Sequence, residues 1–434
     1  MVLLINKLMK KYINKAKLLV FSSTAKDTYI LFGGNVLSAF LGFVYTLIIA
    51  RALSIYDFGI FSAAVNLVII LTSITDLGIS TGAVSFVAEA DASGKIELSK
   101  EYIKASSVIR LIVTLIVSLL VIIFSKFVSV KFLATNDPMV AILTGVVTLS
   151  LALPMLVPFI LQAKKKFLNS IIADNLLYLS RLGFAFVFMF LARLTIGNSL
   201  ISFVLGGIVG TIVGIILIKP DFLKSKPTRE TYKKLIKYSG WIGVNRIISS
   251  ISGRLDIQML AVMTGAVATG LYSIPNRLAG FVIVLTSSFS GVLAPRLASF
   301  NNKDQEKKYI IKATLALIPI IAGLVLWVVI AKPFIVILFG DKYLSAVPIF
   351  QALTISMIPF IFTAPSVTAI VYAMKKTVYI GAFSFFQLAA IFLLNLYFIP
   401  KYGPIGPTLT FGITNTILAI YTWLIVIKYY WFDK

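Results

Sequence analysis

The sequence predicts an all-α integral membrane protein whose transmembrane helices, about twelve in number, form two pseudo-symmetric six-helix lobes. Composition is the first observation behind this prediction: 59% of the residues are hydrophobic, 13% are charged and the mean hydropathy is +0.98. An ordinary water-soluble domain carries about 25% charged residues. The second observation is a set of twelve apolar stretches, each long enough to cross a bilayer: 28–50, 57–79, 107–129, 139–161, 170–192, 196–218, 239–262, 271–294, 309–331, 346–370, 378–399 and 405–427.

Basic residues alternate between the two sides of the predicted spans. Loops on one side hold 28 Lys and Arg, those on the other side hold 7, and five arginines lie inside or at the edge of spans. Cytoplasmic loops are enriched in Lys and Arg. We therefore expect a multi-pass protein of a prokaryotic cytoplasmic membrane with both termini in the cytoplasm. The net charge of +24 then belongs to loops that face anionic lipid headgroups and does not indicate nucleic-acid binding.

Residues 1–26 precede the first span and are predicted to form an amphipathic helix on the cytoplasmic face of the membrane. Apolar residues recur there at helical spacing between lysines, a pattern typical of interfacial helices. The same lysines interrupt the apolar core that a cleaved signal peptide requires. We therefore expect this helix to remain on the protein.

The chain contains no cysteine and no histidine. This excludes disulfides, Cys or His zinc sites, histidine proton relays and Ser-His-Asp triads, and we expect no cofactor and no metal. A membrane glycosyltransferase or polymerase would need acidic catalytic motifs at a membrane-proximal loop. The pair Glu97 and Glu101 lies among lysines, as in a solvated helix face, and no nucleotide-binding glycine loop is present. We expect a transporter rather than an enzyme.

An internal duplication is the third observation. Short landmarks recur at a spacing of 210 residues: Gly33 and Asn35 as Gly243 and Asn245, and Ala163 with Lys165 as Ala373 with Lys375. Each half then holds six spans, and an even number gives both halves the same direction, so a pseudo-twofold axis should lie along the membrane normal. We predict four parts: a helix at 1–26, a six-helix lobe at 27–220, a cytoplasmic linker at 221–238 and a second lobe at 239–434.

Polar side chains inside the predicted spans follow helical spacing. In the seventh span one face of a continuous helix would carry Asn245, Ser249, Ser252 and Asp256. In the fifth span one face would carry Asp174, Tyr178 and Arg181. A carboxylate that faces lipid is costly. We expect Asp256 and Asp174 to act either in coupling transport to an ion or in structural ion pairs.

Arginines outnumber acids inside the spans, so the membrane interior is predicted to be net cationic. The planar guanidinium donates two parallel hydrogen bonds to phosphate or carboxylate, which favours an anionic substrate. Intramembrane arginines also form structural ion pairs or snorkel to the interface, so a structural role stays open for each one. The candidate substrate-binding residues are Arg181, Arg246, Arg254, Arg277, Asn35 and Asn245.

Several segments together resemble the polysaccharide-transporter family, and in particular the O-antigen flippases of the multidrug/oligosaccharidyl-lipid/polysaccharide superfamily. The resemblance covers nearly the whole chain and is carried by residues 50–61 (ARALSIYDFGIF), 76–80 (DLGIS), 254–256 (RLD), 270–273 (GLYS) and 339–343 (FGDKY). It implies a V-shaped pair of lobes, as in the related MATE transporters, around a central cavity. It also implies export of a saccharide linked to a polyprenyl phosphate or pyrophosphate. The family has no strict set of substrate residues, so no site is transferred from it, although Arg254 and Asp256 lie within a matching segment.

Two functions of different substrate class remain open within this fold. The first is a flippase that moves a lipid-linked oligosaccharide between leaflets, with membrane lipids and glycan-assembly enzymes as partners. The second is a cation-coupled multidrug exporter of the same superfamily, which would need acidic groups to hold an organic cation. The excess of arginine favours the flippase.

Overall fold

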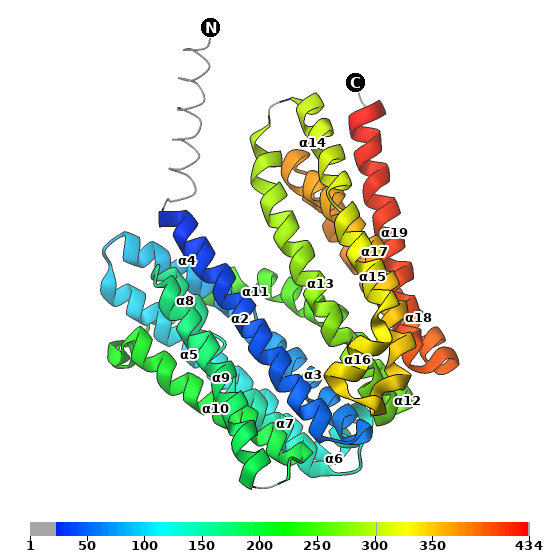
Figure 1. Ribbon diagram of the computed structural model, residues 1–434. Helices are drawn as coiled ribbons and strands as arrows, with labels where there is room; N and C mark the ends of the chain where they lie inside the picture. Colours follow the sequence, from blue (N-terminus) through cyan, green and yellow to red (C-terminus); the bar gives the residue numbers. More distant parts are fainter. Residues whose placement is uncertain (1–22, 192, 301, 433–434) are drawn as a thin grey trace, which may run out of the picture.

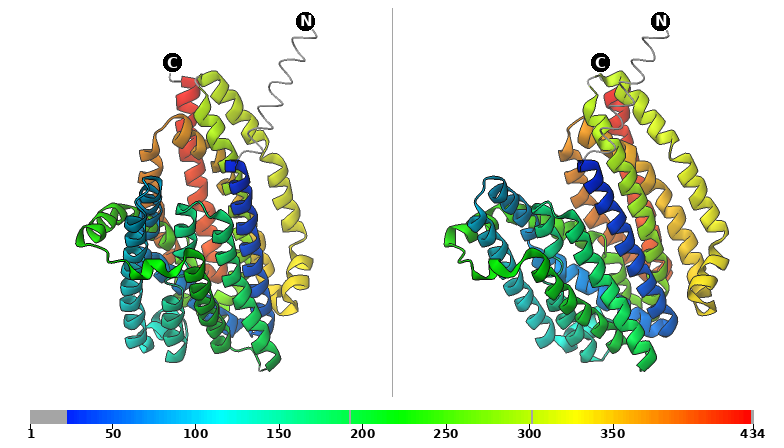
Figure 2. Two further views of the ribbon diagram at one scale, coloured as in Figure 1. Left: turned by 90° about the vertical axis from the view of Figure 1, so that its left-hand side faces the viewer. Right: turned by 60° about the vertical axis from the view of Figure 1, so that its left-hand side comes forward.

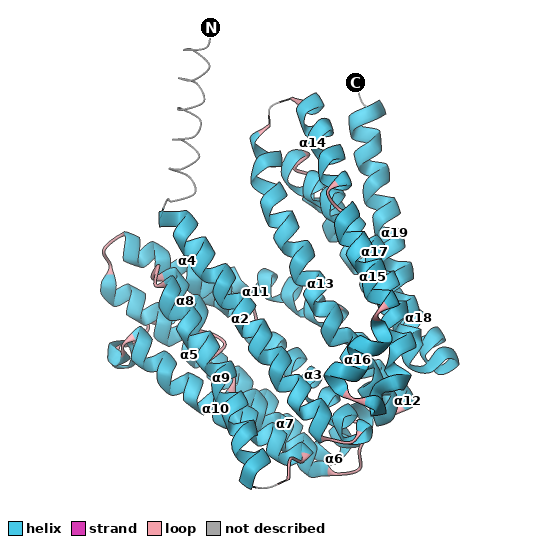
Figure 3. Cartoon of the chain, in the orientation of Figure 1, coloured by secondary structure: helices cyan, strands magenta, loops and turns pink. Residues whose placement is uncertain are grey.

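The computed structural model describes residues 23–191, 193–300 and 302–432, and every regular element in these segments is a helix (Figure 3). Within them, nine helices are long and apolar enough to cross a membrane. The predicted fold class is therefore confirmed. Residues 1–22, which make up most of the predicted surface helix, lie outside the described residues.

The first half of the chain forms one group of helices whose ends follow local sequence signals. Ser54 caps α3 by accepting a hydrogen bond from the backbone N–H of Asp57, and Thr195 caps α10 in the same way through Asn198. The helices are α2 (Ser23–Ala52), α3 (Ile55–Asp76), α4 (Ile79–Ala92), α5 (Ile96–Ile123), α6 (Ser125–Phe132), α7 (Pro138–Ser150), α8 (Val157–Ala163), α9 (Phe167–Leu191) and α10 (Ile196–Ile218).

The second half supplies the other group and is joined to the first half through the short 3₁₀ helix η1 (Pro220–Lys224), but its first helix, α11, packs against α3, α4 and α5 of the first group. Its helices are α11 (Arg229–Ser252), α12 (Leu255–Thr264), α13 (Ala266–Ser299), α14 (Lys303–Leu315), α15 (Ile318–Val329), α16 (Ala331–Phe339), α17 (Val347–Thr368), α18 (Thr377–Tyr402) and α19 (Gly406–Ile427). A second 3₁₀ helix, η2 (Asp341–Ala346), precedes α17, and two short π-helices, η3 (Ala369–Ala373) and η5 (Lys428–Phe432), follow α17 and α19.

The continuous helix predicted for 239–262 is wrong. Helical geometry stops at two residues. Gly253 has φ −78° and ψ 0°, and Arg254 has φ −137° and ψ 0°. The chain restarts as α12, so the polar face predicted to run from Asn245 to Asp256 is divided between two helices. In addition, α11 begins at Arg229, inside the segment expected to be a linker.

The two groups of helices form a V (Figure 1). They meet at the end that holds α6, α12 and α16, and they diverge toward the end where α2 begins and α19 ends. In both views of Figure 2 the yellow segment that contains α15 lies at the right-hand edge of the second group. We call the meeting end the lysine-poor end and the diverging end the lysine-rich end, after the loops located there.

Helix positions repeat between the two groups. The first residues of α3 and α13 are 211 positions apart, and those of α9 and α18, and of α10 and α19, are 210 positions apart. Lys165 and Lys375, also 210 apart, both adopt the left-handed conformation with φ of 56°. Few non-glycine residues adopt positive φ, so two equivalent lysines with the same angle indicate the same local structure. These correspondences support the duplication seen in the sequence.

The two groups come into backbone contact where α3 crosses α13. Gly59 and Gly270, which are equivalent in the repeat, face each other there: a Cβ on Gly59 would overlap the carbonyl oxygen of Ala266, and one on Gly270 would overlap that of Ile55. Such close approach of helices in a membrane requires small residues. The pseudo-twofold axis therefore passes close to this crossing.

Replacing Gly59 with alanine is expected to destabilise the protein, because the new methyl group would meet backbone atoms that cannot rotate away. Overpacking of this kind costs about 1–3 kcal/mol. Gly183→Ala is the matched control, since a Cβ at that helical position meets nothing within 4 Å. Thermal unfolding in detergent should show a lowered midpoint for Gly59→Ala only, and equal midpoints would contradict the close crossing.

Candidate functional site

A cavity of about 220 Å³ lies at the base of the V, between the two groups of helices. We call it the basal cavity. Its walls come from α2, α3, α10, α13 and the break between α11 and α12, and among the described residues they carry the charged residues Arg254 and Arg277 but no carboxylate. The cavity lining is therefore positively charged.

Arg277 projects from α13 across the cavity toward α2. Its Nε donates to Thr46 Oγ1 at 3.1 Å, and one terminal nitrogen donates to the carbonyl oxygen of Gly42 at 3.3 Å. Neither partner is charged, so no carboxylate is bound to the guanidinium, which keeps donors free for a ligand. A cation held by neutral dipoles attracts an anion more strongly than one in an ion pair.

Arg254 reaches the cavity because α11 ends just before it. Asn66 of α3 supports the backbone at the break: its amide nitrogen donates to the Arg254 carbonyl oxygen at 3.0 Å, and the same oxygen accepts from the N–H of Gln258 at 3.5 Å. The Asn66 side chain also lies 3.5 Å from a terminal nitrogen of Arg254. Asn66 therefore positions Arg254. Sequence reasoning missed this role, for which a buried amide in the second span was the only signal.

A second cavity, of about 570 Å³, lies between α2, α3, α5, α8, α9 and α11. We call it the upper cavity, and it adjoins the basal cavity along α3, since Ile69 lines both. Asn35, Asp174 and Arg246 lie in its walls. Asp174 accepts a hydrogen bond from Ser38 at 2.6 Å and so has a polar rather than an ionic partner.

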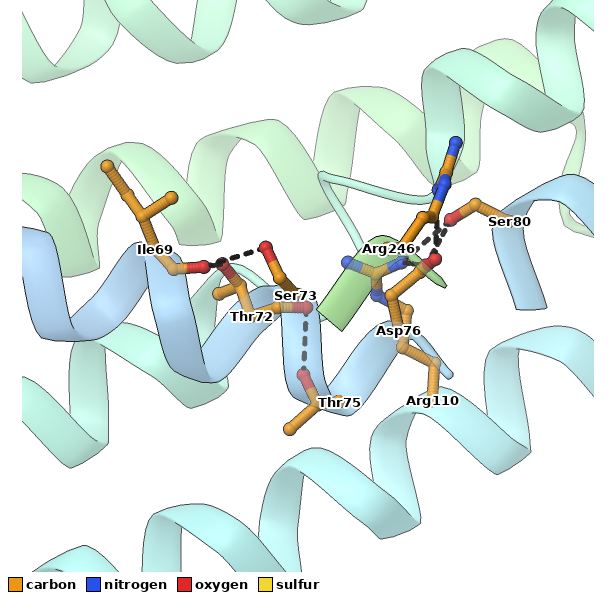
Figure 4. Close-up of polar contacts among 8 residues, drawn as sticks. All are labelled: Ile69, Thr72, Ser73, Thr75, Asp76, Ser80, Arg110 and Arg246. Atoms are coloured by element: carbon orange, nitrogen blue, oxygen red, sulfur yellow. Dashed lines mark hydrogen bonds and ion pairs between the residues drawn. The ribbon is translucent and has the colours of Figure 1, made fainter. Parts of the chain in front are cut away.

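Asp76 at the end of α3 joins two arginines in the upper cavity (Figure 4). One carboxylate oxygen accepts from Arg246 of α11 at 3.0 Å, and the other binds Arg110 of α5, which also donates to Ser80 at 2.8 Å. Arg110 is 3% exposed, whereas 39% of the Arg246 side chain is exposed to the cavity. One acid therefore serves two cations, and the more accessible cation is Arg246.

Two of the candidate substrate-binding residues lie outside both cavities. Arg181 is buried in the first group, with its guanidinium 4.3 Å from the ring centre of Phe203 and 5.3 Å from that of Tyr178. Phe203 itself lines the basal cavity, so Arg181 lies behind the cavity wall. Asn245 is exposed on α11, where its side chain donates to the Trp241 carbonyl oxygen.

Asp256 begins α12, and among the described residues it has no arginine within salt-bridge distance. Its carboxylate accepts from the hydroxyl of Tyr272 at 2.6 Å and from the backbone N–H of Ile257 at 2.8 Å. The bond from Tyr272 ties the start of α12 to α13. The candidate acid therefore connects helices and does not face either cavity.

Asp256→Asn is expected to lower thermal stability modestly, because the hydrogen bond to a charged acceptor, worth about 1.5–3 kcal/mol, becomes a weaker neutral one. If the role is structural, Tyr272→Phe should lower the unfolding midpoint comparably and the double variant should add little. A stable Asp256→Asn protein whose transport no longer follows an ion gradient would instead assign the carboxylate to coupling.

The lysine-poor end of the V is closed by contacts between the α2–α3 turn and the α16–η2 turn. Arg51 Nε donates to the Leu338 carbonyl oxygen at 2.7 Å, and Lys342 donates to the carbonyl oxygens of Leu53 and Arg51 at 2.6 and 2.8 Å. Each of these bonds joins the two groups. The space between the groups therefore widens toward the lysine-rich end.

This architecture defines a class: a multi-pass membrane transporter of two helical lobes around a central cavity. The chain belongs to the polysaccharide biosynthesis protein family, whose model matches residues 24–301. It is 25% identical over 415 residues to the uncharacterized membrane protein MJ1068 of Methanocaldococcus jannaschii, covering 86% of this chain and 78% of that protein. It is 24% identical to a putative O-antigen transporter of Shigella flexneri over 198 residues, 44% of this chain and about half (46%) of that relative.

Solved structures show the same fold. The lipid II flippase MurJ in an inward closed conformation has a TM-score of 0.74 at 16% identity, covering 92% of this chain and 87% of that one. An inward-facing multidrug resistance MATE family transporter of the MOP superfamily has a TM-score of 0.70 at 13% identity, covering 89% and 93%. An outward-facing multidrug resistance MATE family transporter has a TM-score of 0.58 at 15% identity, covering 94% of this chain and 96% of that one.

Proposed function

We propose that this protein is a flippase that translocates a polyprenyl-phosphate-linked or polyprenyl-pyrophosphate-linked oligosaccharide from the inner to the outer leaflet by alternating access. The observation that carries the proposal is the basal cavity, where Arg254 and Arg277 face the space between the lobes without an acidic partner among the described lining residues. A phosphate or diphosphate is an anion that the planar guanidinium groups of arginine bind through two parallel hydrogen bonds. The family supports a role in the synthesis of surface polysaccharide.

The proposed path follows the charged groups. The phosphate first meets Arg246 in the wider upper cavity and then reaches Arg254 and Arg277 at the base. The lipid tail stays in the bilayer, while the headgroup occupies the gap between the lobes. Exchange between two lobe arrangements then exposes the headgroup on the other side.

The proposal includes a location, an orientation and a division of the chain. The lysine-rich end faces the cytoplasm and holds both termini, so the V is open to the leaflet in which lipid-linked sugars are assembled. The lobes comprise residues 27–220 and 239–434, with 221–238 between them. Enzymes that build the glycan on the cytoplasmic face are the proposed protein partners.

A cation-coupled multidrug exporter is the second candidate, because the lobes overlap well with an inward-facing MATE family transporter. Asp174 in the upper cavity is the acid that would hold an organic cation. The basal cavity argues against this function, since its two arginines repel a cation. Substrate charge therefore separates the two candidates.

Reconstitution into vesicles tests the choice between them. The first probe is a fluorescent polyprenyl-diphosphate-linked disaccharide, whose movement is monitored by its oxidation with impermeant periodate. The second probe is ethidium, whose movement is monitored by its fluorescence. We expect the protein to accelerate movement of the saccharide and not of ethidium. Transport of ethidium alone would establish the exporter, and transport of neither would contradict the proposed function.

A further inference from the structure

The surface of the first lobe carries an apolar groove where α5 meets α6. Its volume is about 570 Å³, and it is lined only by hydrophobic side chains: Leu71, Val117, Leu120, Val121, Phe124, Phe127 and Val128. The groove exists because the helix is interrupted at Phe124, whose φ and ψ of −93° and 26° end α5 and begin α6 at a new angle. The same residue contributes a ring to the groove wall.

The composition and exposure of the groove suit contact with the hydrocarbon region of a membrane. Leu120, Phe124 and Phe127 are 50%, 56% and 57% exposed in the chain, and α5 is one of the helices apolar enough to span a bilayer. Water in such a groove would contact only apolar side chains, which is unfavourable. A hydrocarbon chain is the occupant that fits this lining.

A basic pocket of about 470 Å³ continues the groove around α6 and shares Phe124 and Phe127 with it. It is lined by two lysines, Lys126 and Lys131, neither of which forms an ion pair or hydrogen bond with the part of the chain that the structure describes. The nearby acid in the sequence, Asp137, uses its carboxylate to cap α7. Two positive charges therefore remain at the edge of the groove.

Both lysines lie at the lysine-poor end, where α6 is located (Figure 1). Loops at this end contain only 7 basic residues, and two of the seven fall within six positions of each other here. The usual bias places such residues on the opposite side of the membrane. A local anionic ligand explains their position better than general attraction to a charged bilayer.

We propose that the apolar groove and the basic pocket together bind a lipid whose head is a phosphate monoester, in the leaflet at the lysine-poor end. The groove holds the hydrocarbon chain and the two ammonium groups hold the phosphate. A phosphate monoester carries a charge of about −1.5 to −2 near pH 7, which matches two lysines, whereas a phosphodiester carries one charge. This site is separate from the basal cavity and does not depend on the transported substrate.

Native mass spectrometry of the purified protein tests this site with three lipids of identical chains: phosphatidic acid, phosphatidylglycerol and phosphatidylcholine. We expect the protein to retain phosphatidic acid, the monoester, most strongly, phosphatidylglycerol, a diester, less strongly, and phosphatidylcholine, a zwitterion, least. The double variant Lys126→Gln, Lys131→Gln should lose roughly thirtyfold in affinity for phosphatidic acid, because each lysine near a lipid surface contributes about 1 kcal/mol and 1.4 kcal/mol is tenfold. Its affinity for phosphatidylcholine should not change.

Lys401→Gln is the matched control, since this lysine lies in the last turn of α18 at the same end and over the rings of Tyr397 and Tyr402. It should bind phosphatidic acid as the wild type does. Leu120→Trp, which fills the groove, should weaken retention of all three lipids. Unchanged binding of phosphatidic acid by the double lysine variant would overturn the site, and equal retention of phosphatidylglycerol would overturn the monoester assignment.

Discussion

Arg277→Ala and Arg254→Ala should each reduce translocation of a lipid-linked saccharide at least tenfold without unfolding the protein. Hydrogen bonds to a charged partner contribute about 1.5–3 kcal/mol, and 1.4 kcal/mol corresponds to a factor of ten. Both side chains face an open cavity and have only neutral partners. Their removal therefore costs the protein little while the substrate loses its anchor. Initial translocation rates in vesicles measure the effect.

Lysine substitutions separate the contributions of charge and geometry. Arg277→Lys keeps the positive charge but loses the planar fork, so it should retain part of the activity if the phosphate is clamped by two parallel bonds. Arg296→Ala is the control, because this arginine lies on the same helix outside both cavities. Wild-type rates for both cavity variants would refute an anion site at the base of the V.

Asp76→Ala is expected to lower the stability of the protein more than any of the other single substitutions. It leaves Arg110, which is 3% exposed, without its carboxylate, and removal of one partner from a buried ion pair costs about 3–5 kcal/mol. The change also removes the ion pair between Arg246 of α11 and α3. Thermal unfolding in detergent should show a markedly lowered midpoint.

A second substitution distinguishes an unpaired charge from lost packing. In Asp76→Ala, Arg110→Leu the buried cation is gone, and replacing both partners with apolar groups can be nearly neutral. The double variant should therefore recover much of the midpoint. Arg246→Ala alone should have a small effect, since that side chain is 39% exposed. A double variant less stable than Asp76→Ala would contradict the pairing.

Hydropathy and repeated landmarks predict most of this architecture. Apolar length depends on the bilayer alone, so spans can be located without knowing what packs against them. The repeat at Lys165 and Lys375 extends to an unusual backbone angle, because a duplicated sequence keeps its local conformations. The resemblance to polysaccharide transporters agrees with the family to which the chain belongs.

The site could be predicted only in part, because its features depend on tertiary contacts. Gly253 lies inside a helical pattern and glycine alone does not end a helix. The break is supported by Asn66, which lies 188 positions away from Arg254 in the sequence. Helical periodicity predicts which face of its helix carries Arg181, but it does not predict that aromatic rings surround the guanidinium. Likewise, the spacing between Asp76 and Arg110 on different helices does not indicate which arginine pairs with which acid.

Accessibility of the basal cavity from each side of the membrane tests the central claim most directly. The chain has no cysteine, so Ser62→Cys places a single thiol on the cavity wall. We predict that an impermeant maleimide reacts from the lysine-rich side alone, and that a polyprenyl-diphosphate-linked oligosaccharide makes the thiol reactive from the opposite side as well, as turnover exposes the cavity there. Labelling from both sides without substrate, or labelling that stays one-sided during turnover, would contradict alternating access by this cavity.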